Sequence, residues 1–284
     1  MHIGSAGSNF KIWNDIAKNS ILVTIDGNKT FVNSKKKFKK MINDRVIISN
    51  KNGMGKFYLT YDPDCSSLLE PDKLVHEDWY GSHRFKIKKI QKKKIYSINN
   101  FLKSKKINYV DWFVTDVQGK DLDIIKSMRG NLRNKISIID IETGFFSFYK
   151  KADKISDVFN FMTKSHDFEN MEFGFNYKLF SRNISKFEKK ILFRYNNPSK
   201  IYSNIIFINK KKNIERINLL KLIYLVENNK IFEARQLIDN ISKHSEFYKE
   251  ITKKIEHLIR VQKIKFLILS PFYAIKKILN IILN

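Results

Sequence analysis

The stretch YVDWFVTDVQGKDLDIIKSM, Tyr109 to Met128, contains the sharpest change of residue pattern in the chain. From Tyr109 to Thr115 the residues are mostly aromatic or β-branched, with no glycine or proline, which predicts a largely buried β-strand. After Gly119 the apolar residues recur at a spacing of three and four, which predicts a helix. In an open α/β sheet, ligands bind beyond the carboxyl ends of the strands, and we expect Asp116 to Gly119 to lie there.

This stretch resembles the signature of the FkbM family of S-adenosylmethionine-dependent methyltransferases. In that family an aspartate, one further residue, a Gln or Glu and a Gly follow the central strand, as Asp116, Gln118 and Gly119 do here, and an acidic residue follows at Asp121. Three more pieces lie in the family's order, namely GSAGSNFKIW near the start, Cys65 to Pro71, and Ile139 to Met162. Agreement of several pieces in order is more specific than any single motif.

The resemblance implies an α/β fold over residues 1–209, with a Rossmann-like class I methyltransferase sheet and helices on both of its faces. A C-terminal all-helical extension is expected after it, because the pattern beyond Lys210 is helical throughout. Within residues 210–260 we expect an antiparallel helical hairpin. Residues 261–284 form a basic amphipathic tail, which fits either a helix on a membrane surface or a helix docked on the domain.

Composition limits the setting and the partners. Cys65 is the only cysteine, which excludes an intrachain disulfide and a cysteine cluster for zinc and favours a reducing, cytoplasmic location. The opening residues lack the pattern of a secretory signal. The net charge is +26, but the lysines are spread over nearly every segment and no nucleic-acid recognition motif accompanies them. We therefore expect no nucleic-acid partner.

Small residues near the start predict a close backbone approach to a ligand ahead of a helix. The candidate cofactor-binding residues there are Gly4, Ser5 and Gly7. A plain turn from strand to helix is the alternative. Similar methyltransferases have an acidic residue just before the first glycine, whereas His2 stands at that place here. Either the first strand is very short or the start is truncated.

Ile21 to Ile25 predicts a second strand, which ends at Asp26. In dinucleotide-like sites an acid about 20 residues past the glycine loop binds the ribose hydroxyls, so Asp26 is a further candidate cofactor-binding residue. The Asp-Gly pair at this place also fits the turn of a β-hairpin. Ser34 to Ile42 predicts a helix.

Lys135 to Ile141 predicts the next buried strand, and Glu142 follows it. The resemblance places Glu142 on the same sheet edge as Asp116. Two carboxylates in one pocket could act as general base and orienting group for a hydroxyl, or could share a divalent metal. Asp116 and Glu142 are the candidate catalytic residues, with a structural salt bridge as the alternative role for Asp116. Histidine spacing indicates no metal site, and we assign no metal ligand.

The remaining candidates lie beside these carboxylates. Gln118 is a candidate cofactor-binding residue, while Ser66, Ser67 and Asp121 are assigned to a substrate loop through the resemblance. Ser66 or Ser67 could instead cap a helical turn. Asp121 could simply be a negative charge at a helix start.

Together these observations imply transfer of a methyl group from S-adenosylmethionine to an oxygen, which we expect to be a hydroxyl of a sugar or glycan. Two alternatives stay open: methylation of a nitrogen or a small metabolite, and a degenerate, non-catalytic module in a glycan-assembly system. We expect a cytoplasmic protein, and residues 261–284 suit peripheral contact at the inner face of the membrane. The sequence predicts no oligomeric state.

Overall fold

The computed structural model of the protein describes residues 1–5, 17–27, 38–73, 82–164, 168–178, 199–212, 214–228, 230–238, 249 and 252–261. The chain divides into two compact units, Met1–Lys212 and Asn213–Asn284. The candidate site residues that the structure describes all belong to the first unit.

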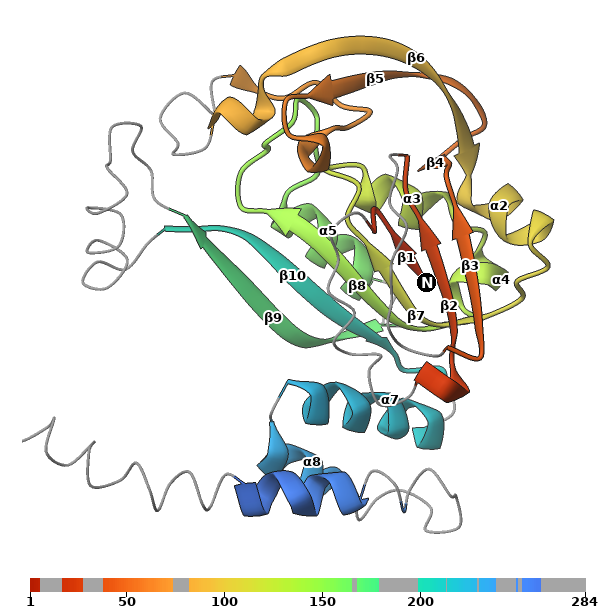
Figure 1. The fold of residues 1–284 in the computed structure, drawn as a ribbon, viewed down its shortest axis with the longest axis vertical. Coiled ribbons are helices and arrows are strands. Elements are labelled where there is room, and N and C mark those ends of the chain that lie inside the picture. Colours follow the sequence, from red (N-terminus) through yellow and green to blue (C-terminus); the bar gives the residue numbers. More distant parts are fainter. Residues whose placement is uncertain are drawn as a thin grey trace, which may run out of the picture. The chain divides into compact units, whose positions relative to one another are not determined.

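Among the described residues, seven strands form one large sheet in the order β3-β2-β1-β7-β8-β10-β9 (Figure 1). Its strands are β1 (His2–Ile3), β2 (Ile21–Ile25), β3 (Lys40–Asp44), β7 (Val110–Thr115), β8 (Ile136–Gly144), β9 (Phe168–Lys178) and β10 (Ser199–Asn209). Neighbours from β3 to β8 run parallel, whereas β10 is antiparallel to both β8 and β9. This arrangement confirms the predicted Rossmann-like α/β fold class.

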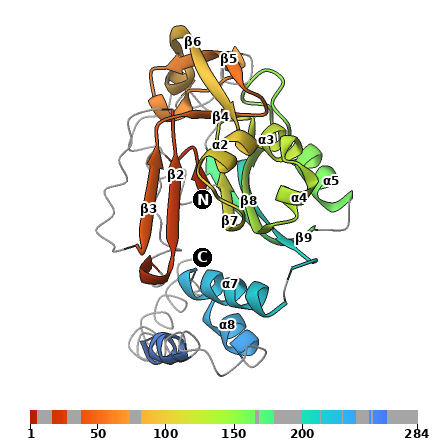
Figure 2. The same ribbon diagram turned by 90° about the vertical axis from the view of Figure 1, so that its right-hand side faces the viewer.

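Within the described ranges, the helices of the first unit cover one face of the large sheet (Figure 2). They are α2 (Ile98–Ser104), α3 (Asp121–Ser127), α4 (Gly130–Arg133) and α5 (Ile155–Lys164). Between sheet and helices lies one apolar cluster, in which Phe113, Ile139 and Phe207 from three strands are fully buried. Leu122 and Ile125 of α3 pack in the same cluster. Helix α3 therefore forms where its apolar face meets the sheet.

A small second sheet lies beyond the carboxyl ends of the parallel strands, at the top of Figure 1. Its order is β4-β6-β5, formed by β4 (Ile47–Ser49), β5 (Gly53–Thr60) and β6 (Ile87–Ser97). Short 3-10 turns occur at η2 (Ala17–Asn19), η3 (Pro63–Cys65) and η4 (Ser82–Phe85). An isolated bridge joins Tyr58 of β5 to Ser67, which attaches the loop after η3 to the small sheet.

The prediction of a helix over Ser34 to Ile42 is wrong for the carboxyl end of this range. Residues 28–37 lie outside the described residues, but Lys40–Asp44 is strand β3, paired in parallel with all of β2. Pairing with a neighbouring strand overrides local propensity here. A helix cover for the opposite face of the sheet also falls outside the described residues.

The two edges of β2 decide between the two readings of its sequence. β2 pairs in parallel with β3 on one side and with β1 on the other. The Asp-Gly hairpin would need one of these edges for an antiparallel partner. The structure therefore excludes the hairpin and leaves Asp26 at the carboxyl end of a parallel strand.

The second unit contains α7 (Ile214–Glu227) and α8 (Ile231–Ile238), which contact each other. Residues 252–261 are also helical. Residues 262–284 lie outside the described residues, so the separate tail and its membrane contact stay predictions. Within the described ranges, no helix has the length and apolar character needed to span a membrane.

Gly4 is fixed by the way β1 ends against β7. Its φ is +75°, and a Cβ at this position would lie 1.7 Å from the carbonyl oxygen of Asp116. We expect Gly4→Ala to lower the free energy of unfolding by about 2 to 3 kcal/mol or more, measured by urea denaturation. Gly130→Ala is the matched control, because its added Cβ would meet no atom within 4 Å beyond its chain neighbours and the backbone of its own helix. Equal stability of the two variants would contradict this account.

Candidate active site

A cavity of about 320 Å³ opens at the carboxyl ends of the parallel strands. The ends of β1, β2, β7 and β8 line it through Gly4, Asp26, Asp116 and Glu142, and Phe57 lines it from the small sheet. Small-molecule sites in proteins commonly occupy about 300 to 1,000 Å³. The cavity thus lies where an open α/β sheet is expected to bind a ligand.

The cavity is acidic although the chain is strongly basic. Among the described residues that line it, six carry carboxyl groups and two carry basic groups. The carboxyl groups belong to Asp26, Asp64, Asp116, Asp121, Glu142 and Asp153, and the basic groups to Arg84 and Lys120. A concave site lined by one sign of charge raises the local concentration of ligands of the opposite sign. The cavity therefore favours a cationic ligand.

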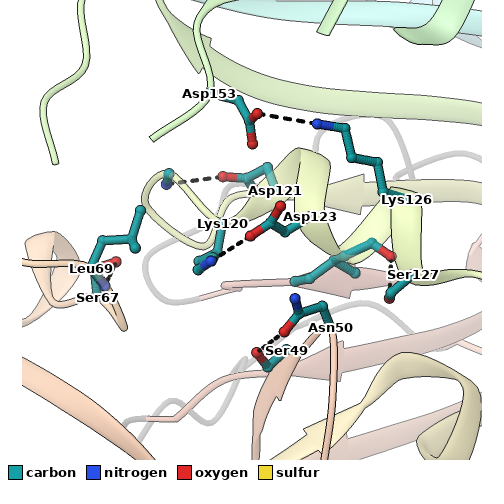
Figure 3. A network of polar contacts seen from close by, with 12 residues as sticks. Ser49, Asn50, Ser67, Leu69, Lys120, Asp121, Asp123, Lys126, Ser127 and Asp153 are labelled. Atoms are coloured by element: carbon teal, nitrogen blue, oxygen red, sulfur yellow. Dashed lines mark hydrogen bonds and ion pairs between the residues drawn. The ribbon is translucent and has the colours of Figure 1, made fainter. Parts of the chain in front are cut away.

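The loop between β7 and α3 is held by Asp121. Its Oδ1 accepts hydrogen bonds from the Thr115 hydroxyl at 2.7 Å and the Val117 N–H at 2.9 Å, and its Oδ2 accepts one from the Gly119 N–H at 3.1 Å. Figure 3 shows Asp121 facing the backbone of this loop. The side chain is buried, and this burial raises its pKa to about 7, against the effect of these donors. The structure thus gives Asp121 an anchoring contact rather than an ordinary helix-end charge.

Asp116 and Glu142 meet in the cavity and are hydrogen-bonded to each other. Burial raises the pKa of both side chains, that of Glu142 well above its ordinary range, where the charge of Asp116 adds to the effect. Two neighbouring buried carboxyl groups cannot both ionise without large repulsion. The pair therefore shares a proton at pH values at which exposed carboxyl groups are ionised. The alternative of a salt bridge for Asp116 has no support in these contacts.

The sequence predicted that Glu142 follows the strand. In the structure Glu142 lies within β8, two residues before its end. The strand continues because β10 pairs with it as far as Gly144, which lies opposite Tyr202. Pairing with a strand distant in sequence decides this boundary. Within the described residues, no cluster of three or more His, Cys, Asp or Glu side chains could hold a metal ion.

Gln118 joins the carboxyl pair to two other loops. Its φ of +60° lies in the left-handed region, and its Nε2 donates to Asp116 Oδ1 at 2.7 Å. The hydroxyl of Ser67 donates to the Gln118 carbonyl oxygen at 2.8 Å, and the Tyr149 hydroxyl lies 2.8 Å from Gln118 Oε1. Gln118 is thus the point where three segments of the chain meet.

Ser66 and Ser67 border the cavity, and neither begins a helix in the described structure. The Ser66 hydroxyl accepts from the Thr60 N–H at 3.1 Å and so fixes the end of β5. Ser67 accepts from the Leu69 N–H at 3.0 Å, in a local turn that Figure 3 also shows. The capping residue in this region is Asp62, at the start of η3.

The structure places Gly4 and Asp26, two of the candidate cofactor-binding residues, at the cavity. The Gly4 N–H donates to the Ile25 carbonyl oxygen at 2.9 Å, and the Asp26 N–H donates to the Asp44 carbonyl oxygen at 3.1 Å, so both backbones are fixed at the cavity edge. Gly7 lies outside the described residues. His2 lies in β1, and burial lowers its pKa to about 3, so the imidazole is neutral there. A neutral imidazole does not supply the negative charge of the acid that similar proteins carry.

Sequence reasoning did not identify Tyr149, Arg84 or Tyr202 as parts of the site, although all three line the cavity. Tyr149 is buried, and Arg84 forms an ion pair of 2.5 Å with Asp62. None of them follows a motif at fixed spacing from Asp116. Only the tertiary contacts between loops reveal them.

A family model described as the methyltransferase FkbM domain matches residues 6–173. The chain belongs to the FkbM methyltransferase family. The match covers more than half of the chain, and membership makes methyl transfer the activity class of this protein. The matched range contains Asp26, Asp116, Gln118 and Glu142, whereas Gly4 and Tyr202 lie outside it. Neither a curated protein nor a solved structure matches the chain.

Replacement of Asp121 tests how this residue anchors the loop between β7 and α3. Asp121→Ala leaves three donors without their acceptor, and we expect a loss of about 2 to 4 kcal/mol in the free energy of unfolding. Asp123→Ala is the control from the same helical turn, because it removes only the ion pair with Lys120 (Figure 3), and it should cost less than about 1 kcal/mol. Similar losses in both variants would show that Asp121 is an ordinary helix-end charge.

Proposed function

We propose that this FkbM-family protein transfers the methyl group of S-adenosylmethionine to a hydroxyl of a sugar or glycan. The observation that supports the proposal most directly is the Asp116–Glu142 pair, which lies inside an acidic cavity at the carboxyl edge of the parallel strands. Such a pair can accept one proton from a hydroxyl group.

The chemistry of the cavity supports this cofactor. S-adenosylmethionine carries two positive charges, on its sulfonium and its α-ammonium group, which suits a cavity rich in carboxyl groups. Asp26 would hold the ribose hydroxyls, because it ends β2 at the cavity. The buried hydroxyl of Thr143, which lines the cavity, has no hydrogen-bond partner among the described residues. Buried polar groups usually have partners, so this atom supports a polar ligand at this edge.

The division of labour between cofactor and protein follows from the chemistry of methyl transfer. S-adenosylmethionine supplies an electrophilic methyl group whose leaving group is a neutral thioether. The protein must position the acceptor and, for a hydroxyl, remove one proton. Asp116 is the proposed base, since it is the ionised member of the pair when Glu142 holds the shared proton. An aromatic ring at the cavity, Phe146, is 48% exposed and supports a sugar as the acceptor.

Binding of S-adenosylmethionine is the first test of the proposal. We expect calorimetry to show binding, and Asp26→Ala to weaken it by at least about tenfold, because hydrogen bonds to a carboxylate are lost. Glu70→Ala is the control: Glu70 forms an exposed ion pair with Lys150 and does not line the cavity, so the affinity should not change. Absence of binding by the folded wild-type protein would contradict the cofactor assignment.

Methyl transfer to a panel of oligosaccharides and amines tests the acceptor and the base. We expect methylation of hydroxyl acceptors, and Asp116→Asn should reduce the rate at saturating cofactor about 100- to 10,000-fold. The base must be unprotonated, and the pKa of the pair is raised. As the pH is lowered, activity should therefore be lost at a higher pH than it would be for a base with the pKa of an ordinary carboxyl group. Transfer to amines alone, or full activity of Asp116→Asn, would contradict the proposal.

A further inference from the structure

The hydroxyl of Tyr149 lies between two oxygen atoms. It is 2.8 Å from the carbonyl oxygen of Cys65 and 2.8 Å from Oε1 of Gln118. Tyr149 is 3% exposed, and burial raises its pKa well above the ordinary value, so the hydroxyl keeps its proton. A phenol has one proton to donate, yet both neighbouring atoms are acceptors in this arrangement. One of the two contacts therefore lacks a hydrogen.

Rotation of the Gln118 amide by 180° removes this conflict. The two ends of a glutamine amide have nearly the same shape, so the same space accepts either orientation. In the rotated form Nε2 donates to the Tyr149 oxygen, and Tyr149 donates to the Cys65 carbonyl oxygen. Each of these contacts then has one hydrogen.

The rotation of the Gln118 amide changes which protonation state of Asp116 is favourable. In the first orientation Nε2 donates to Asp116 Oδ1 at 2.7 Å, which suits an ionised carboxylate. In the rotated orientation a carbonyl oxygen faces Asp116, and the contact is favourable only if Asp116 carries a proton. Glu142 can still donate its own proton to the other oxygen of Asp116. One orientation therefore fits a pair with one proton, and the other fits a pair with two.

We propose that Tyr149 is a positioning residue that acts through the Gln118 amide to favour the doubly protonated Asp116–Glu142 pair. The second proton would complete a chain of four hydrogen bonds, from Glu142 to Asp116, Gln118, Tyr149 and the Cys65 carbonyl oxygen. Its importance for catalysis rests on the proposed function, in which Asp116 accepts the proton of the acceptor hydroxyl. In that step the O–H bond of the acceptor breaks and a bond from the proton to Asp116 forms, so Tyr149 makes Asp116 a stronger base.

Other charged and titratable groups also face the pair, from every element around the cavity. The acidic groups follow β2, lie in η3, begin α3 and lie in β8, and the others lie in η3, η4 and β10. They are Asp26, Asp64, Asp121, Asp140, Cys65, Arg84 and Tyr202. The charges of the four aspartates raise the pKa of one member of the pair or the other. All of these groups are retained when only Tyr149 is changed, so their contributions cancel in a comparison with the wild-type protein.

The test is an infrared titration of the carboxyl pair in the ligand-free protein, with its bands identified by their loss in Asp116→Asn. We expect Tyr149→Phe to lower the pKa of the second proton by about half to one pH unit, because it removes the advantage of one hydrogen bond. Simple loss of a polar neighbour would act in the opposite direction, since poorer solvation raises the pKa of a carboxyl group. An unchanged or raised pKa in Tyr149→Phe would overturn the proposal.

Two controls isolate the path through Gln118. Tyr202→Phe removes another phenol that lines the cavity and has no hydrogen bond to Gln118 among the described contacts, so it should not lower the pKa. Gln118→Met keeps the length of the side chain and removes both amide groups. In this background Tyr149→Phe should have no further effect, as a double-mutant cycle requires. A full effect there would exclude transmission through the amide.

One readout needs no variant of Tyr149. In the wild-type protein, the side-chain NH₂ signals of Gln118 in nuclear magnetic resonance spectra, assigned by their loss in Gln118→Met, should shift at the pKa of the pair as the NH₂ group changes partner. Signals that stay constant through this titration would overturn the proposal even if Tyr149→Phe does not fold. These measurements use neither cofactor nor acceptor, so their failure is distinct from failure of the proposed methyl transfer.

Discussion

Burial of the Asp121 carboxylate is the constraint on which the site depends. A buried carboxylate without partners is costly, and here the backbone and side chain of the preceding loop supply its donors. Wrapping the loop around Asp121 fixes the carboxyl end of β7 and holds Gln118 in a left-handed conformation. The hydroxyls of Ser67 and Tyr149 form hydrogen bonds with Gln118 of the same loop. Three segments that are distant in sequence meet because one side chain needs partners.

The sign of the charge inside the site is opposite to that of the chain. The protein has a net charge of +26, yet carboxyl groups dominate the cavity. Their crowding has two physical consequences. It favours cationic ligands through the local field, and it adds to burial, which is the larger cause, in raising the pKa of Asp116 and Glu142. One arrangement of charges thus supports both the proposed cofactor and the proposed proton transfer.

Local sequence pattern correctly predicted the strands and helices that have a clear periodicity of their own. The strand at Ile21–Ile25 and the helix that follows Gly119 agree with the structure, because strand and helix periodicities differ clearly in these stretches. The pattern failed at Lys40–Asp44, where pairing with β2 decides the conformation. It also ended β8 too early, because pairing with β10 extends the strand beyond Glu142.

The sequence by itself determined the α/β fold class, the FkbM resemblance and the positions of Asp26 and Asp116 directly after strands. These features follow from periodicity and from motifs of fixed spacing, which are local properties of the chain. Only the tertiary structure decided that Asp116 and Glu142 share a hydrogen bond, that Asp121 anchors the loop, and that Tyr149 contacts Gln118 and Cys65. Tyr149 and Cys65 are 84 residues apart, and no local pattern encodes a contact that forms only when separate loops pack over the same sheet edge.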